Sequence, residues 1–156
     1  MQGYYKGNIK GIESQEVKVG NSRGTYIQWL ITDRQESAYA MRRFIIKPDG
    51  FIQLHYHDYF ESLYIIDGKC SVSVNGDYME LGRGDFIFID TKYSHEIRNI
   101  ENRDLEFICV INYTENMAMD LFKIYKCISI AFLNRMIYIN GSFKYFDLSF
   151  RMYPSL

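Results

Sequence analysis

The chain has 156 residues, of which 47% are hydrophobic and 17% aromatic, and it carries a net charge of −1. This length and apolar content suffice for one folded domain with a buried core and argue against intrinsic disorder. Basic residues form no stripe, so we expect no nucleic-acid partner. No segment resembles a signal peptide or a membrane span, and the three cysteines form no paired motif, so we expect a cytoplasmic protein with reduced thiols.

Short extended segments separated by turn signals fill residues 20–112, and none of them has a convincing helical period. Their β-branched and aromatic residues favour strands. The expected strands cover residues 24–31, 38–47, 51–57, 61–66, 69–74, 77–81, 86–90, 95–99 and 105–112. We interpret this region as a β-meander that closes into a barrel or a two-sheet jelly roll.

Three turn signals separate the middle strands. The tripeptide Pro48-Asp49-Gly50 is expected to end one strand before the next begins. The Asp-Gly pair at 67–68 and the Asn-Gly pair at 75–76 each predict a tight hairpin, because these dipeptides favour two-residue turns with positive φ.

The pattern changes at about residue 113. Residues 115–136 are expected to form a helix with apolar residues three and four positions apart, and residues 137–146 a hairpin around an Asn-Gly pair. We therefore divide the chain into a barrel domain, residues 1–112, and a C-terminal extension, residues 113–156, that packs on the barrel or on a dimer partner. The apolar side chains of this extension lead us to expect a homodimer.

The three histidines of the chain have the spacing of a metal site. His55 and His57 are two residues apart, so on a strand they project from the same side. Glu61 follows shortly after, and a later strand can bring His95 beside them. Three imidazoles and a carboxylate suit one divalent transition metal ion (Mn, Fe, Ni, Co, Cu or Zn) and leave one or two coordination positions open. We therefore predict a metal site at His55, His57, Glu61 and His95.

The spacing resembles the two sequence motifs of the cupin superfamily. Gly50-(x4)-His55-x-His57-(x3)-Glu61-(x6)-Gly68 is similar to the first motif, and Gly84-Asp85-(x9)-His95-(x3)-Asn99 is similar to the second. The resemblance covers roughly residues 25–112 and is closest to small single-domain cupins. It implies an all-β fold, a double-stranded β-helix or jelly-roll barrel that is often dimeric, with the metal held inside the barrel by His55, His57, Glu61 and His95.

The chain departs from the cupin motifs at turns rather than at ligands. The glycine of the first motif lies one residue closer to His55 than is usual, and Gly82 and Asp90 stand where prolines are common. These departures concern the shapes of loops.

Several polar and aromatic residues near the motifs have two interpretations. Neighbouring strand residues face opposite sides, so at most one of Arg42 and Arg43 points into the barrel. An inward arginine favours an anionic ligand, and a solvated arginine is an equally good interpretation. We expect Asn99 to satisfy backbone groups at a strand end, and Trp29 to lie in the core or an interface.

These observations favour a metal-dependent enzyme that acts on a small polar or carboxylated metabolite. Dioxygenase, decarboxylase and isomerase chemistry are all open, and no catalytic residue beyond the ligand set stands out. The alternative is a non-catalytic small-molecule sensor, because residues 55–90 are also similar to the sensing barrel of arabinose-regulator-type transcription factors. Those regulators carry helix-turn-helix units after the barrel, and the tail of this chain lacks a basic recognition helix.

Overall fold

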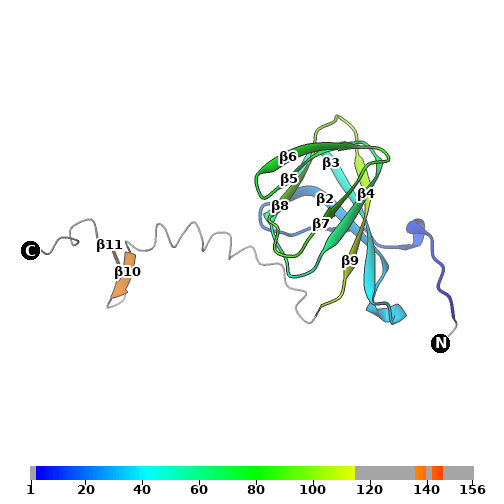
Figure 1. Ribbon diagram of the computed structural model, residues 1–156, viewed down its shortest axis with the longest axis horizontal. Coiled ribbons are helices and arrows are strands. Elements are labelled where there is room, and N and C mark those ends of the chain that lie inside the picture. The colour runs from blue at the N-terminus through cyan, green and yellow to red at the C-terminus, as the bar shows by residue number, and fades with distance from the viewer. Residues whose placement is uncertain (1–2, 115–135, 140–141, 146–156) are drawn as a thin grey trace, which may run out of the picture. The chain divides into compact units, whose positions relative to one another are not determined.

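The computed structural model describes residues 3–114, 136–139 and 142–145. The chain divides into two compact units, Met1–Leu121 and Phe122–Leu156, which are described separately. In the first unit, one nine-stranded sheet rolls around a common interior (Figure 1). Its strands are β1 (Gln15–Glu16), β2 (Arg23–Ile31), β3 (Tyr39–His55), β4 (Glu61–Asp67), β5 (Lys69–Val74), β6 (Asp77–Gly82), β7 (Phe86–Ile89), β8 (His95–Asn99) and β9 (Leu105–Asn112). Two short 3₁₀ turns, Ile9–Gly11 and Asp33–Gln35, flank β2 on either side along the chain.

The interior of the roll follows from alternation of apolar residues along the strands. In β9 every second side chain is buried, and these are Leu105, Phe107, Cys109 and Ile111. The other strands contribute apolar side chains to the same cluster, including Phe44, whose ring stacks on that of Phe107. One continuous core therefore lies inside the roll, as the period-two pattern of the sequence predicts.

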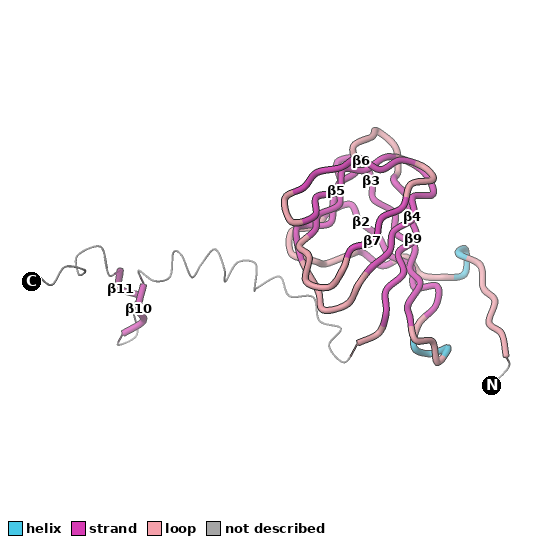
Figure 2. Tube along the Cα trace, in the orientation of Figure 1, coloured by secondary structure: helices cyan, strands magenta, loops and turns pink. Residues whose placement is uncertain are grey.

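The strand order confirms a jelly roll and shows that the predicted meander is wrong. The order along the sheet is β6-β5-β8-β3-β9-β4-β7, with β2 beside β3. Several neighbours, such as β3 and β8, are therefore far apart in sequence. Figure 2 shows β5 and β6 in one part of the roll and β4, β7 and β9 in the other. Alternation predicts which face of a strand is buried, but it does not predict its partners.

Two of the expected turns have a different role in the structure. Residues 67–68 form no hairpin, because β4 pairs with β7 and β9 whereas β5 pairs with β6 and β8. The chain crosses there from one half of the roll to the other. The Asn-Gly pair at 75–76 does join the hairpin of β5 and β6, with both residues at positive φ.

The expected strand end at residues 48–50 is also wrong, because these residues lie inside β3, which is 17 residues long. Arg23 of β2 lies opposite Phe51 and Thr25 lies opposite Ile46, so residues 47–50 of β3 form a bulge. Proline has no N–H to donate to a neighbouring strand, which favours such an interruption. At this bulge β3 leaves β9 and begins to pair with β8.

The crossing at Gly68 is expected to tolerate no side chain. Gly68 has φ +83°, and an added Cβ would lie 2.9 Å from the carbonyl oxygen of Asp104. Gly76 has φ +95° with no atom within 4 Å of such a Cβ, so it is a matched control for the backbone effect alone. We expect Gly68→Ala to lower the free energy of unfolding by about 2–4 kcal/mol and Gly76→Ala by about 1 kcal/mol, as measured by urea denaturation. Equal losses would contradict the close contact.

Asn99 stabilises the end of β8, as the sequence predicts. Its amide nitrogen donates to the carbonyl oxygens of Ile46 (2.9 Å) and Arg103 (2.7 Å), and its oxygen accepts from the N–H of Glu101 (2.9 Å). The side chain is buried, and these bonds satisfy three backbone groups.

In the second unit, β10 (Met136–Ile139) and β11 (Ser142–Tyr145) pair as an antiparallel hairpin, in agreement with the sequence. The helix expected at 115–136 falls almost wholly outside the described residues, as does the third cysteine, Cys127. The division at residue 112 and the packing of the extension stay predictions. No helix in the described segments has the length and apolar character needed to cross a membrane.

Candidate metal centre

The four residues of the predicted metal site come together inside the roll. His55 is the last residue of β3 and His95 the first of β8, and the two are directly paired in the sheet. Glu61 is the first residue of β4, and His57 lies just beyond the end of β3. All four residues are at most 5% exposed.

The donor atoms of these residues converge. One ring nitrogen from each of the three histidines lies within 4.8 Å of the other two. The Glu61 carboxylate has Oε1 at 3.0 Å from His95 Nε2 and Oε2 at 3.7 Å from His57 Nε2. Three buried histidines and a glutamate thus form a cluster that could hold a metal ion.

Backbone carbonyls fix the orientation of each imidazole. The Nδ1 atoms of His55, His57 and His95 lie within hydrogen-bond distance of the carbonyl oxygens of Gln53, Tyr59 and Tyr93, respectively. With Nδ1–H donating to a carbonyl, Nε2 keeps its lone pair, which is the state that a metal requires.

Three of the converging atoms are buried without a hydrogen-bond partner. They are Nε2 of His57, Nε2 of His95 and Oε1 of Glu61. Buried polar atoms without partners are costly in a folded protein, and a cation at their centre would satisfy all three. Imidazole and carboxylate are also the donor types that divalent transition metals accept. The residues therefore fit such an ion.

The titration behaviour of the cluster follows from its burial. Burial and the neighbouring His95 lower the pKa of His55 to about 3. Burial also opposes charge on His95, but the adjacent Glu61 outweighs it and raises the pKa of His95. Burial alone would raise the pKa of Glu61, whereas His95, His57 and Arg42 hold it well below its usual value. A proton on His95 therefore competes with a metal ion for the same lone pair.

Arg42 points into the barrel, which resolves the alternative that the sequence left open. Its Nη2 lies 2.8 Å from Cys109 Sγ and 3.5 Å from Glu61 Oε2, and its Nε has no hydrogen-bond partner. Arg43 faces the other way and pairs with Glu106 and with Gln28. The guanidinium of Arg42 thus lies at the candidate metal centre.

Cys109 is part of the site, and the sequence analysis missed it. Its Sγ donates to Glu61 Oε2 at 3.3 Å while accepting from Arg42. Burial raises the pKa of the Cys109 thiol, so it stays protonated and can donate. Its position in β9, in phase with the buried Phe107 and Ile111, was the available signal that it faces inward.

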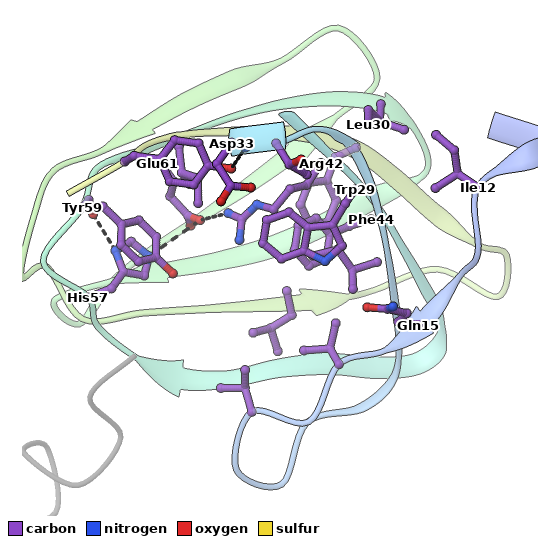
Figure 3. Close-up of a pocket in the computed structure, with 18 of the residues that line it drawn as sticks. Ile12, Gln15, Trp29, Leu30, Asp33, Arg42, Phe44, His57, Tyr59 and Glu61 are labelled. Atoms are coloured by element: carbon purple, nitrogen blue, oxygen red, sulfur yellow. Dashed lines mark hydrogen bonds and ion pairs between the residues drawn. The ribbon is translucent and has the colours of Figure 1, made fainter. Parts of the chain in front are cut away.

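A cavity of about 840 Å³ extends from the centre, and its wall includes His55, His57, Glu61 and Arg42. Figure 3 shows His57, Tyr59 and Glu61 at one end with Arg42 beside Glu61, Trp29 and Phe44 beyond Arg42, and Gln15 at the other end. The ring of Tyr59 stacks on His57 with centroids 3.8 Å apart. Trp29 lies on this wall and is 37% exposed, so it is not a core residue, and its place in an interface stays a prediction.

Comparison with known proteins agrees with this architecture. Residues 42–111 match the family model of the cupin domain. An oxalate-binding protein of Thermotoga maritima is 39% identical over 70 residues, which are 44% of this chain and 58% of that protein. The uncharacterized HTH-type transcriptional regulator YdeC of Bacillus subtilis is 32% identical over 62 residues, which are 40% of this chain and 21% of that protein. The chain therefore spans less than two thirds of either curated relative.

A solved structure extends the similarity over more of the chain. The crystal structure of a predicted oxalate decarboxylase from Thermotoga maritima superposes with a TM-score of 0.60 at 28% identity. The match covers 67% of this chain and 96% of that one.

Proposed function

We propose that the barrel, which matches the cupin domain model over residues 42–111, binds one divalent transition metal ion through His55, His57, Glu61 and His95. We further propose that the ion and Arg42 together hold the carboxylate of a small molecule. The observation that carries the proposal is the convergence of buried, unpartnered Nε2 and carboxylate atoms on one point. A bound ion would supply Lewis-acid polarisation of a carboxylate or carbonyl oxygen.

The charges of the site favour an anionic ligand. Arg42 and Glu61 are both buried and offset each other's charge. A divalent ion beside three neutral imidazoles would leave the buried cluster with an excess of two positive charges, which is unfavourable in a low-dielectric interior unless an anion compensates it. A carboxylate is an anion whose two oxygens match the planar donors of a guanidinium.

The protein's own groups would orient this ligand. Burial raises the pKa of the Tyr59 hydroxyl to about 12 against the opposing charge of the nearby Arg42, so this hydroxyl stays protonated at neutral pH. Arg42 lies against the rings of Trp29 and Phe44, with its Cζ 5.6 and 5.2 Å from the two centroids. These contacts hold the guanidinium in place on the cavity wall, where it can donate to a carboxylate.

The comparisons support a carboxylated ligand. The curated match from Thermotoga maritima is described as an oxalate-binding protein, and the solved structure from the same organism as a predicted oxalate decarboxylase. We propose that this chain is a metal-dependent enzyme for a small carboxylated metabolite, of decarboxylase, dioxygenase or isomerase type. Beyond the ligand set, Arg42 and Tyr59 are polar side chains on the wall of the same cavity.

A non-catalytic sensor is the second candidate, and the match to a transcriptional regulator favours it. The part of the chain that the structure describes contains two 3₁₀ turns and no α-helix, so it includes no helix-turn-helix. The two candidates differ in turnover: an enzyme converts its carboxylate, whereas a sensor binds the same molecule and returns it unchanged.

The proposal is tested by metal analysis and carboxylate binding. We expect about one ion per chain in protein purified without chelators, and binding of at least one of acetate, oxalate and benzoate by calorimetry. Arg42→Gln should weaken that binding by about 10- to 100-fold, because it removes a charge-assisted hydrogen bond. Arg43→Gln is the matched control, since the Arg43 side chain pairs with Glu106 and Gln28 rather than with the site, and it should bind like the wild type. Protein that takes up no metal would refute the proposal.

A further inference from the structure

The cavity is much larger than a metal ion and a carboxylate require. Its volume of about 840 Å³ falls in the range of about 300–1,000 Å³ that is typical of pockets for drug-sized molecules. The candidate metal centre occupies one end of it (Figure 3). Most of the space therefore lies beyond the reach of a two-carbon acid bound at that end.

The middle of the cavity is apolar. Trp29 and Phe44 lie there (Figure 3), and the wall as a whole includes further side chains of β2, β3, β8 and β9 that have no charged group, namely Ile27, Ile52, Ile97 and Phe107. The other charged side chains on the wall, such as Glu16, Lys18 and Asp33, are exposed and lie at the surface. The cavity thus has a charged inner end, an apolar middle and a polar surface end.

Trp29 is incompletely covered in this arrangement. Its inward neighbours on β2, Thr25 and Ile27, are buried, whereas Trp29 keeps 37% of its surface exposed. Its ring lies beside Arg42, so an apolar group that covered the indole would adjoin the guanidinium. Burial of exposed apolar surface is the main favourable contribution to the binding of small molecules in such pockets.

We propose that the ligand is a carboxylate with an apolar body of at least one ring. Its acid group would lie at Arg42 and the candidate metal centre, and its body would lie along Trp29, Phe44 and Ile27. This inference rests on the proposed function for the position of the ligand's acid group, and it adds the chemical class of the rest of the ligand. It distinguishes this cavity from a site built for a compact diacid such as oxalate.

Ligand binding can be measured by the fluorescence of Trp29, because it is the only tryptophan in the chain. We expect 3-phenylpropanoate to change the tryptophan fluorescence of metal-loaded protein and to bind at least tenfold more tightly than acetate or oxalate. The neutral 3-phenylpropanamide should bind at least tenfold more weakly than the acid. Equal or tighter binding of oxalate would overturn this inference and leave the proposed function intact. If no carboxylate binds to metal-loaded protein, both fail.

A substitution that fills part of the cavity tests the contact with the apolar body separately from the contact with the acid group. Val17 is half-buried on the cavity wall, whereas Val110 is a half-buried valine on the outer face of β9, out of phase with its buried residues. We expect Val17→Phe to weaken 3-phenylpropanoate at least tenfold while leaving metal content and acetate binding unchanged. Val110→Phe should leave all three unchanged. Loss of 3-phenylpropanoate binding in both variants, or in neither, would overturn the proposed position of the apolar body.

Discussion

His95→Ala is expected to abolish the retention of a divalent metal by the purified protein. His95 is fully buried, and its Nε2 lies 3.0 Å from Glu61 Oε1 among the converging donors. Alanine offers no donor atom in place of Nε2. Because changes around metal ligands already cost about 10- to 100-fold in affinity, loss of a ligand should cost at least as much. Elemental analysis after gel filtration should fall from about one ion per chain to nearly none.

The neighbouring residue provides the control for this variant. Glu96 follows His95 on β8, and its carboxylate pairs with Arg98 rather than with the centre. Glu96→Ala should keep its metal. Added metal should also raise the melting temperature of the wild type and of Glu96→Ala but not of His95→Ala, because only a ligand that binds the folded state stabilises it. Full metal content in His95→Ala would show that the proposed ligand set is wrong.

Arg42→Met is expected to destabilise the metal-free protein by about 3–5 kcal/mol, as measured by urea denaturation in the presence of a chelator. The methionine removes the positive partner of Glu61, whose carboxylate is only 7% exposed and would lose a compensating charge. A buried charge without its partner is costly, whereas a neutral replacement of both partners often costs little. The losses in unfolding free energy caused by substituting Arg42 and Glu61 should therefore not add up independently.

The double variant tests this coupling. Arg42→Met combined with Glu61→Gln should recover a large part of the stability lost in Arg42→Met, because no buried charge of the pair then remains. Arg43→Met is the matched single control: Arg43 also pairs with a glutamate, but that pair is partly exposed, so its loss should cost about 1 kcal/mol or less. Additive effects of the two buried substitutions, within about 0.5 kcal/mol, would contradict the coupling.

The jelly-roll class was predictable because the sequence encodes burial locally. Alternation along residues 105–112 matches the observed buried and exposed pattern of β9 residue by residue. The Asn-Gly pair at 75–76 specifies its own backbone conformation, so its hairpin was also predictable. Residues 48–50 were predicted to end a strand, and instead they form part of a bulge within β3. A bulge and a turn have the same local composition, and only the pairing of β3 with both β9 and β8 distinguishes them.

The candidate site was predictable for a similar reason. His55, His57 and Glu61 lie within seven residues of each other, so local geometry limits how far apart they can be. His95 was placed by resemblance to a known motif, and the structure pairs it directly with His55 across β3 and β8. Cys109 belongs to no motif, and its contact with Glu61 joins residues 48 positions apart.

The sequence by itself determined which side chains are available for chemistry and which face of each strand is apolar, because both depend on residue type and on the two-residue period of a strand. Only the tertiary structure decided which strands lie side by side, that Arg42 rather than Arg43 faces inward, and that Trp29 lines a cavity. The physical reason is that both faces of residues 40–47 carry apolar residues and one arginine, so alternation leaves the inward face of this one strand undefined, and alternation in any strand says nothing about its neighbours. That choice is made when the sheet closes and buries the apolar face of every strand at once.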